Sequence, residues 1–273
     1  MALIMKPADF LKKSFNLTKT YAELGNLTPV TFAARHGMVD YIQSKLALLS
    51  EKQVQTILAQ TNSAGLTALH FSALYGQIES IQTLLNLGAS PTAKSSLGHM
   101  PIHLIFNDKN DTDKMTQLFE IFKTNNEALV AKTNSKDNVA HLAAIKGQIG
   151  ILKSIQIEAP NMFDSKNNQG MTPLHTAILN NQFTSLQYLY EHCDNQLTNS
   201  IGQNALHLAA KFSIPEVLEF LLPLYDVNQI DNEKHTALDL AILVNNTENI
   251  NILNSHISCE QKEDNSGEYQ TGL

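Results

Sequence analysis

The 273-residue chain contains no tryptophan, only two cysteines and a single arginine. Cys193 and Cys259 are too few for a disulfide framework, and this scarcity favours a reducing compartment. No apolar run approaches the roughly 20 residues that a membrane-spanning helix needs. The apolar run at residues 1–6 is too short for a secretory signal peptide. We therefore expect no membrane span and a cytoplasmic location.

The chain also lacks an excess of basic residues. It has 19 lysine and arginine residues against 26 aspartate and glutamate residues, giving a formal net charge of −7. A nucleic-acid-binding protein usually presents a basic face. Arg35 is the sole arginine, so bidentate recognition of phosphates by arginine is largely unavailable. The sequence therefore predicts no nucleic-acid partner.

Motifs for catalysis and for cofactor or metal binding are missing as well. There is no glycine-rich phosphate loop, no H-E-x-x-H and no C-x-x-C. The alternating carboxylates between Asp108 and Asp113 lack the glycine and the distal glutamate of a calcium loop. We expect no catalytic residue, no cofactor and no metal, and therefore not an enzyme.

One enzymatic alternative stays open at Cys193, a cysteine-dependent hydrolase or transferase hidden in a diverged copy of a repeated motif. A thiol beside an imidazole is a known arrangement for nucleophilic catalysis, and His192 precedes Cys193 directly. On a helix, however, consecutive side chains point about 100° apart and do not face each other. The base would have to come from another part of the chain.

One short motif recurs along the whole sequence. Its clearest copy runs from Gly65 to Gly76 and reads GLTALHFSALYG. With the histidine as the marker, the copies fall 32 to 39 residues apart, at Thr31, His70, His103, His141, His175, His207 and Asp239. A period of this length is typical of repeat architectures.

Each copy predicts a short helix, a sharp stop and a second helix. Most copies start with threonine or asparagine, which cap helix N-termini, whereas Met100 predicts a poorer cap in the third copy. Residues that tolerate a left-handed backbone end the first helix, and they are Gly37, Gly76, Gly147, Asn181 and Asn245. Apolar residues at helical spacing follow, so the pairs must stack to bury them.

The period near 33 residues and the T-P-L-H-x-A core resemble the ankyrin repeat. The resemblance covers roughly residues 27–256 and implies an all-α solenoid of about seven helix-turn-helix repeats with β-turn finger loops. The expected repeats are about 27–61, 62–94, 95–132, 133–166, 167–198, 199–230 and 231–257. Residues 1–26 are expected to form an N-terminal helical cap, and residues 258–273 a disordered acidic tail.

The recurring histidines are too far apart to share a metal. Stacked repeats lie ~8–10 Å apart, whereas zinc needs its nitrogen ligands at ~2.0–2.1 Å. The resemblance implies that each histidine ring bonds the neighbouring finger loop instead. The first and third repeats are longer than the others, and their insertions provide either binding loops or only extra bulk.

The resemblance implies a protein–protein interaction module that binds a partner through its concave face, formed by finger tips and the exposed ends of the first helices. Carried over to this chain, the partner-binding residues are Leu66, Tyr75, Leu97, His99, Asp108, Asp137, Ile145, Lys146, Met171, Ile201, Gln203, Lys211, Phe212 and His235. Aromatic residues and methionine among them are types enriched in interface cores. We expect a monomer that binds one partner protein.

The acidic C-terminal end is similar to the translocation signals of effectors that some intracellular bacteria inject into host cells. It suggests that the chain is secreted into the host cell cytoplasm and acts on a host protein. An endogenous cytosolic scaffold is the other interpretation.

Overall fold

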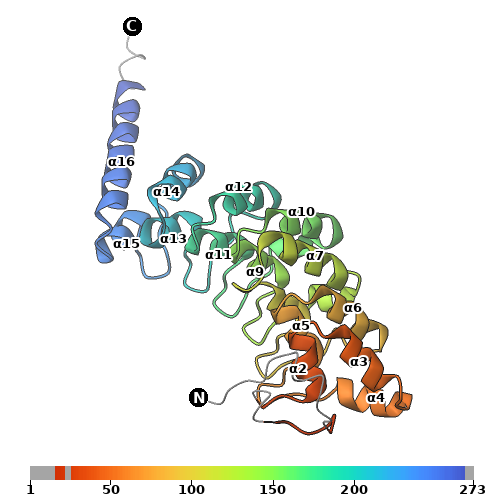
Figure 1. Ribbon diagram of the computed structural model, residues 1–273. Helices are drawn as coiled ribbons and strands as arrows, with labels where there is room; N and C mark the ends of the chain where they lie inside the picture. Colours follow the sequence, from red (N-terminus) through yellow and green to blue (C-terminus); the bar gives the residue numbers. More distant parts are fainter. Residues whose placement is uncertain (1–15, 22–25, 268–273) are drawn as a thin grey trace. The chain divides into compact units, whose positions relative to one another are not determined.

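The computed structural model describes residues 16–21 and 26–267, with side chains of the last helix described up to Cys259. In this part, the all-α repeat solenoid expected from the sequence is confirmed: short inner helices alternate with outer helices (Figure 1). The inner helices are α2 (Pro29–Arg35), α5 (Ala68–Leu74), η2 (Pro101–Ile105), α9 (Val139–Ile145), α11 (Pro173–Leu179), α13 (Ala205–Phe212) and α15 (Ala237–Leu243).

The outer helices follow the inner ones after a tight turn, or, between η2 and the outer helix that follows it, after a longer loop. They are α3 (Val39–Leu46), α6 (Ile78–Asn86), α7 (Thr112–Phe122), α10 (Ile149–Glu158), α12 (Phe183–His192), α14 (Pro215–Leu221) and α16 (Thr247–Gly267). Four further segments complete the repeats: α4 (Glu51–Leu58), α8 (Asn126–Val130), η3 (Pro160–Phe163) and η4 (Leu222–Leu224). Within the described residues, no helix combines the length and apolar character needed to cross a membrane.

Local sequence explains where the inner helices begin and end. Thr67 caps α5 by accepting a hydrogen bond from the backbone N–H of His70, and Asn204 caps α13 in the same way. Met100 offers no side-chain cap, and the third inner helix is a five-residue 3-10 helix, η2. The left-handed stops are confirmed, with φ between 51° and 70° at Gly37, Gly76, Gly147, Asn181 and Asn245.

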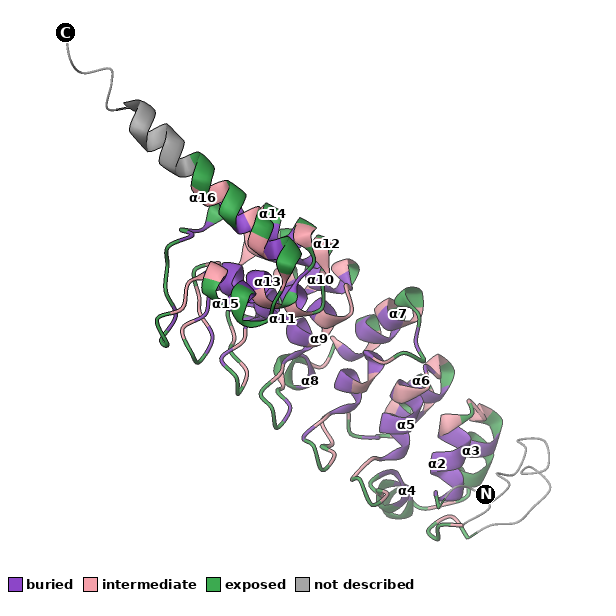
Figure 2. Cartoon of the chain, turned by 90° about the vertical axis from the view of Figure 1, so that its left-hand side faces the viewer, coloured by how far each residue is buried: buried purple, intermediate pink, exposed green. Residues whose placement is uncertain are grey.

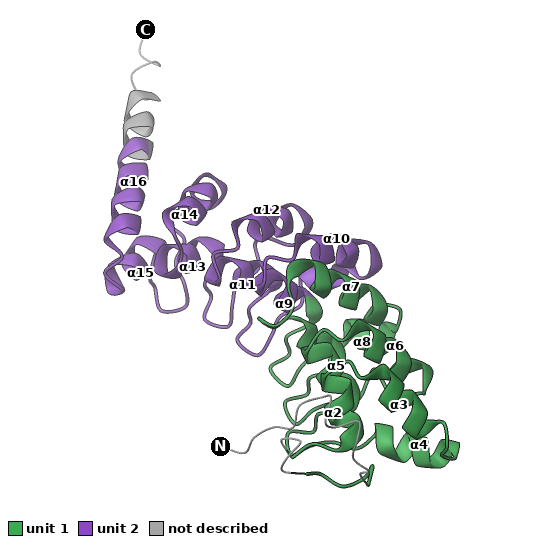
Figure 3. Ribbon diagram, viewed as in Figure 1, with its two compact units in different colours: residues 1–139 green, residues 140–273 purple. Residues whose placement is uncertain are grey.

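The chain divides into two compact units, residues 1–139 and 140–273 (Figure 3). In the first unit, α2, α5 and η2 pack side by side, and α3, α6 and α7 form the layer behind them. In the second unit, α11, α13 and α15 form the inner layer, while α10 packs on α12 and α14 on α16. Figure 2 shows that the inner helices are mostly buried and that exposed residues lie on the loops and on the outer helices.

The structure describes the terminal segments of the chain only in part. Helix α16 continues to Gly267, so residues 258–267 are helical where the sequence predicts disorder. The glutamate, glutamine and lysine residues at 260–263 have high helix propensity, which explains the extension. Residues 268–273, and residues 1–15 and 22–25 of the expected cap, lie outside the described residues.

Candidate functional site

The finger loops that precede the inner helices are joined to one another by backbone hydrogen bonds. In the first unit, the N–H of Asn134 donates to the carbonyl of Leu97 over 3.1 Å. In the second unit, the N–H of Asn232 donates to the carbonyl of Ile201 over 3.0 Å. The backbone at Leu97 and Ile201 is therefore fixed, although both side chains remain exposed.

The histidines of the motif supply a second set of bonds between repeats. In four of them, ring Nε2 lies within hydrogen-bond distance of a backbone carbonyl of the next finger. The pairs are His70 with His99 (3.0 Å), His103 with Ala131 (3.2 Å), His141 with Met171 (2.9 Å) and His207 with His235 (3.2 Å). The implied structural role is thus confirmed at these four positions, whereas the ring of His175 interacts with the backbone of Leu197 and makes no bond of this kind to the described residues of the next finger.

Burial favours the uncharged form of four motif histidines, His70, His103, His175 and His207. It lowers the pKa values of His70 and His207, and it lowers those of His103 and His175 to about 4. A neutral ring can donate from one nitrogen and accept at the other. At His70, Nδ1 accepts the backbone N–H of Thr67 while Nε2 contacts the carbonyl of the next finger loop. The histidines bonded to a finger therefore hold the carbonyls of the finger loops, including those of three predicted partner-binding residues, His99, Met171 and His235.

The predicted partner-binding residues occupy finger tips and inner-helix ends in both units. Leu97, Ile201 and Phe212 are 66%, 44% and 50% exposed, and Asp108 is exposed as well. Half-buried positions are held by Leu66, Tyr75, His99, Asp137, Ile145, Lys146, Met171, Lys211 and His235. Leu66, Tyr75, Leu97, His99, Asp108 and Asp137 belong to the first unit, and the others to the second.

Gln203 does not lie on this solvent-facing surface, because it is only 3% exposed. Its side-chain amide donates to Asp231 over 3.1 Å, and its side-chain oxygen accepts from Asn199 over 3.3 Å. Gln203 therefore links two successive finger loops. The pairing with Asp231, 28 positions away, is not apparent from the repeat pattern alone.

Leu243 and Val244 are exposed residues outside the predicted set. They are 64% and 39% exposed and lie at the end of α15, where Leu243 takes the repeat position of Lys211 and Val244 that of Phe212. Because α15 is the last inner helix that the structure describes, no further inner helix covers them. Their place in the final repeat is the sequence feature that could have identified them.

Tyr75 lies between two cations that the prediction also omitted. Its ring centre is 4.6 Å from the Arg35 guanidinium carbon and 4.3 Å from the Lys109 Nζ. Both distances fall in the range of cation–π attraction. Arg35 ends α2 and Lys109 follows η2, so the contact joins three successive repeats.

The surroundings of Cys193 do not support its use as a nucleophile. Burial, together with the negative charges of Asp164 and Asp194, raises the pKa of the thiol to about 12. The ring of His192 stacks on Tyr188, and its Nδ1 lies 2.7 Å from the Tyr188 carbonyl. The neighbouring imidazole is therefore engaged elsewhere, and the thiol carries no charge at neutral pH.

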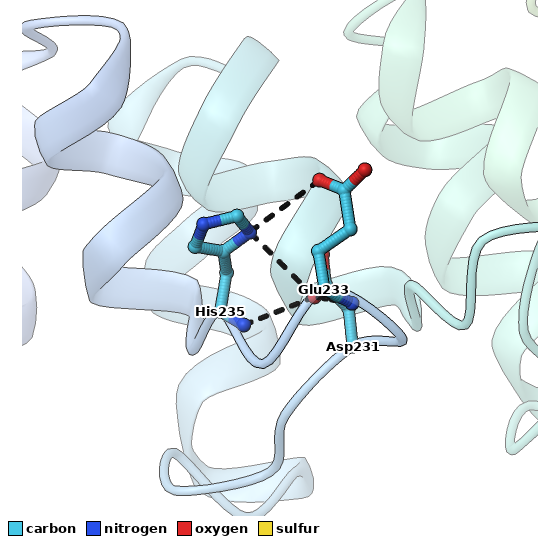
Figure 4. Close-up of side chains that lie close together, drawn as sticks. All are labelled: Asp231, Glu233 and His235. Carbon is cyan, nitrogen blue, oxygen red and sulfur yellow. Dashed lines mark hydrogen bonds and ion pairs between the residues drawn. The ribbon is translucent and has the colours of Figure 1, made fainter.

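One group of side chains in the described residues has the composition of a metal site: Asp231, Glu233 and His235 (Figure 4). The Nδ1 of His235 lies 3.7 Å from an Asp231 oxygen and 3.6 Å from a Glu233 oxygen. The same Asp231 oxygen already accepts the backbone N–H groups of Glu233 and His235, and its other oxygen accepts from Gln203. These bonds occupy lone pairs that a metal would need. They also tie Asp231 to the backbone of its own finger loop, so the cluster stabilises that loop.

Comparison with known proteins yields a family and a fold. The family model described as ankyrin repeats (3 copies) matches residues 3–95, 102–199 and 180–263. The chain is similar to the crystal structure of the human ASB11 ankyrin repeat domain, with a TM-score of 0.65 and 19% identity, covering 79% of this chain and 92% of that one. At this identity the likeness shows the fold alone.

Two curated relatives are much longer than the matched region. Human transient receptor potential cation channel subfamily A member 1 is 32% identical over 117 residues, which cover 41% of this chain and 10% of that protein. Mouse Rabankyrin-5 is 25% identical over 186 residues, covering 63% of this chain and 15% of that protein. The chain thus spans only a small part of either relative.

Proposed function

Because the chain belongs to the ankyrin repeat family, we propose that it recognises a partner protein through its finger tips and inner-helix ends. Ankyrin repeats indicate a protein–protein interaction module, and stacked repeats offer extended binding surfaces. The finer proposal concerns which residues bind. The observation that carries it is the exposure of large apolar side chains at backbone positions held by bonds between repeats.

Phe212 and Ile201 provide the apolar part of this surface in the second unit. They are 50% and 44% exposed, although side chains of this size are usually buried. Covering such a side chain completely contributes roughly 1.5–3 kcal/mol. A partner that buries both would gain affinity without a deep pocket. Met171, which is half-buried, extends this set, while Leu97 and Tyr75 are the corresponding anchors in the first unit.

Charged residues among the predicted positions would decide which partner is accepted. Lys211 lies beside Phe212, with its Nζ 4.9 Å from the ring centre, so one anchor combines an apolar ring and a positive charge. Asp108, Asp137 and Lys146 complete the charged set. Complementary charges at an interface act mainly on specificity and association rate.

The proposed binding surface is tested by pull-down from a host-cell lysate. The experiment compares the intact chain with the variant Leu97→Glu/Ile201→Glu/Phe212→Glu. The matched control is Leu48→Glu/Ile157→Glu/Leu224→Glu, which changes exposed apolar residues away from the finger tips and the inner helices. All three proteins are checked for folding by circular dichroism. We expect a protein that is held by the intact chain and the control and lost by the first variant.

Equal capture by all three proteins would place the binding surface elsewhere, on the outer helices or the insertions. Capture of nothing by the intact chain would remove the support for a binding module. Either result contradicts the proposed surface.

A narrower part of the proposal is that the chain is a bacterial effector whose partner is a host protein. It is supported by the acidic C-terminal end, where Glu260, Glu263, Asp264 and Glu268 cluster. Deletion of residues 258–273 should then abolish translocation while leaving binding of the partner in vitro unchanged. Unchanged translocation would favour an endogenous scaffold.

A further inference from the structure

We propose that Arg35, Tyr75, Lys109 and Lys114, named here the Tyr75 cation cluster, bind an acidic segment of a partner protein. The proposal rests on the proposed function, since it names the chemistry of a partner at one part of the same surface. It concerns the first unit only.

The cluster is assembled from three successive repeats. Arg35 is the last residue of α2, Tyr75 directly follows α5, and Lys109 lies between η2 and α7. Because α5 packs between α2 and η2, the two cations reach the Tyr75 ring from neighbouring repeats on either side. The aliphatic part of Lys114 lies against Gly76, the residue that follows Tyr75.

Among the described residues, the basic side chains of the cluster make no direct ion pair, although the segment that carries Lys109 and Lys114 also holds Asp108, Asp111 and Asp113. In the part of the chain that the structure describes, none of the three basic side chains lies within salt-bridge distance of a carboxylate. The Nε of Arg35 is buried and has no hydrogen-bond partner among these residues. Two cations held around one ring repel each other, and an anion placed beside them would relieve that repulsion.

The neighbouring His36 responds to this positive potential. Its pKa lies below the ordinary value, first because of burial and second because of the Arg35 charge. The rings of His36 and Phe32 lie 4.4 Å apart and are tilted by 46°, and a histidine side chain, neutral or protonated, supplies no negative counter-charge. The unpaired Arg35 side of the cluster therefore favours an anionic ligand.

Carboxylates of a peptide match the geometry of the cluster. A guanidinium that lies over an aromatic ring keeps N–H groups at its edge, and these donate to carboxylates in the plane of the group. Lys109, which comes from the following repeat, adds a second cation over the same ring that can pair with a second carboxylate. The ligand class that satisfies both is a segment rich in glutamate or aspartate.

The test uses fluorescence anisotropy with a fluorescein-labelled octaglutamate peptide and the full chain at low ionic strength. A glycine–serine peptide with the same label is the neutral probe. Each exposed ion pair contributes little to affinity. We therefore expect the loss of two such pairs in Arg35→Gln/Lys109→Gln to weaken octaglutamate binding by only about tenfold. Tyr75→Leu keeps both charges and should weaken binding less, since it removes only the ring that orients them.

Lys45→Gln is the matched control. It removes the same charge from another cation–π pair, in which the Lys45 Nζ lies 5.7 Å from the Tyr41 ring centre on α3. We expect its affinity for octaglutamate to equal that of the wild type. Thermal unfolding by circular dichroism confirms that each variant is folded.

Three outcomes would overturn the proposal. These are absence of octaglutamate binding to the wild type, an equal loss in Lys45→Gln, and self-association of the free chain that disappears in Arg35→Gln/Lys109→Gln. The last result would assign the cluster to a second copy of the chain. None of them depends on the pull-down with the apolar variants, so failure of this inference is distinguishable from failure of the proposed function.

Discussion

The first unit, residues 1–139, contains thirteen lysine and arginine residues against eleven acidic residues, whereas the second, residues 140–273, contains six against fifteen. Their net charges are therefore +2 and −9. The ends of the inner helices differ as well: the first unit carries the Tyr75 cation cluster, whereas the second exposes the apolar residues Phe212, Leu243 and Val244. Two chemically different surfaces have been built on one repeated scaffold.

The scaffold can carry both surfaces because the bonds that hold it lie beneath them. Histidine-to-carbonyl bonds recur in both units, at His70 and His103 in the first and at His141 and His207 in the second. In these contacts the histidine bonds a backbone carbonyl of the next finger loop, so the bond does not depend on which side chain that finger residue carries. Tip residues can therefore change from apolar to charged without loss of the fold.

The largest expected effect tests whether both units depend equally on their cores. Phe119 in the first unit and Phe163 in the second are completely buried. Phe119→Ala and Phe163→Ala should each lower the free energy of unfolding by about 3–5 kcal/mol, measured by urea denaturation. Phe212→Ala, at a half-exposed position, is the control and should cost less than about 1 kcal/mol. A large cost in only one unit would show that the two cores are not equivalent.

The next effect concerns pH and should be shared by both units. His103 and His175 have pKa values of about 4 in the folded chain, lowered mainly by burial from an ordinary value of 6.5. Between these values the unfolded chain binds more protons than the folded chain, so stability should fall as the pH decreases from 6.5 toward 4. Each unit of pKa shift corresponds to roughly 1.4 kcal/mol.

Urea unfolding of the wild type, His103→Gln and His175→Gln across this pH range measures the effect. Each substitution should reduce the slope of stability against pH, and comparison with the wild type removes the contribution of the carboxylates. An unchanged slope in either variant would show that burial does not control that histidine.

A smaller effect separates the finger loops of the two units. Gln203→Ala would leave a buried Asp231 oxygen without its donor and should cost about 1–2 kcal/mol. Asn134 makes a similar bond between fingers in the first unit, to the Ser96 carbonyl over 3.1 Å, but it is exposed to water. Asn134→Ala should therefore cost less than about 0.5 kcal/mol in the same assay. Equal costs would contradict a difference caused by burial.

The sequence predicted features that depend on residues close together in the chain, and it missed contacts between residues far apart in the chain. The repeat period, the helix stops at Gly37 and Asn181 and the poor cap at Met100 depend on residues within one repeat, and the structure confirms them. Gln203 and Arg35 were missed or misplaced, because their neighbours Asp231 and Tyr75 lie 28 and 40 positions away in the next repeat. A pattern that repeats identifies the scaffold but not the pairs that occur once.

The smallest stability effect gives the sharpest contrast between the two surfaces. Lys211→Gln in the second unit and Lys109→Gln in the first each remove one cation from an aromatic ring, 4.9 Å and 4.3 Å from its centre. Each should lower the free energy of unfolding by only about 0.5 kcal/mol.

The effects of these two substitutions on octaglutamate binding should differ, because the second unit has a net charge of −9 and therefore repels the acidic peptide. Lys109→Gln should therefore weaken binding in the anisotropy assay, whereas Lys211→Gln should leave it unchanged. An equal loss in both variants would mean that the peptide senses the total charge of the chain, and the distinction between the two surfaces would then have no role in recognition.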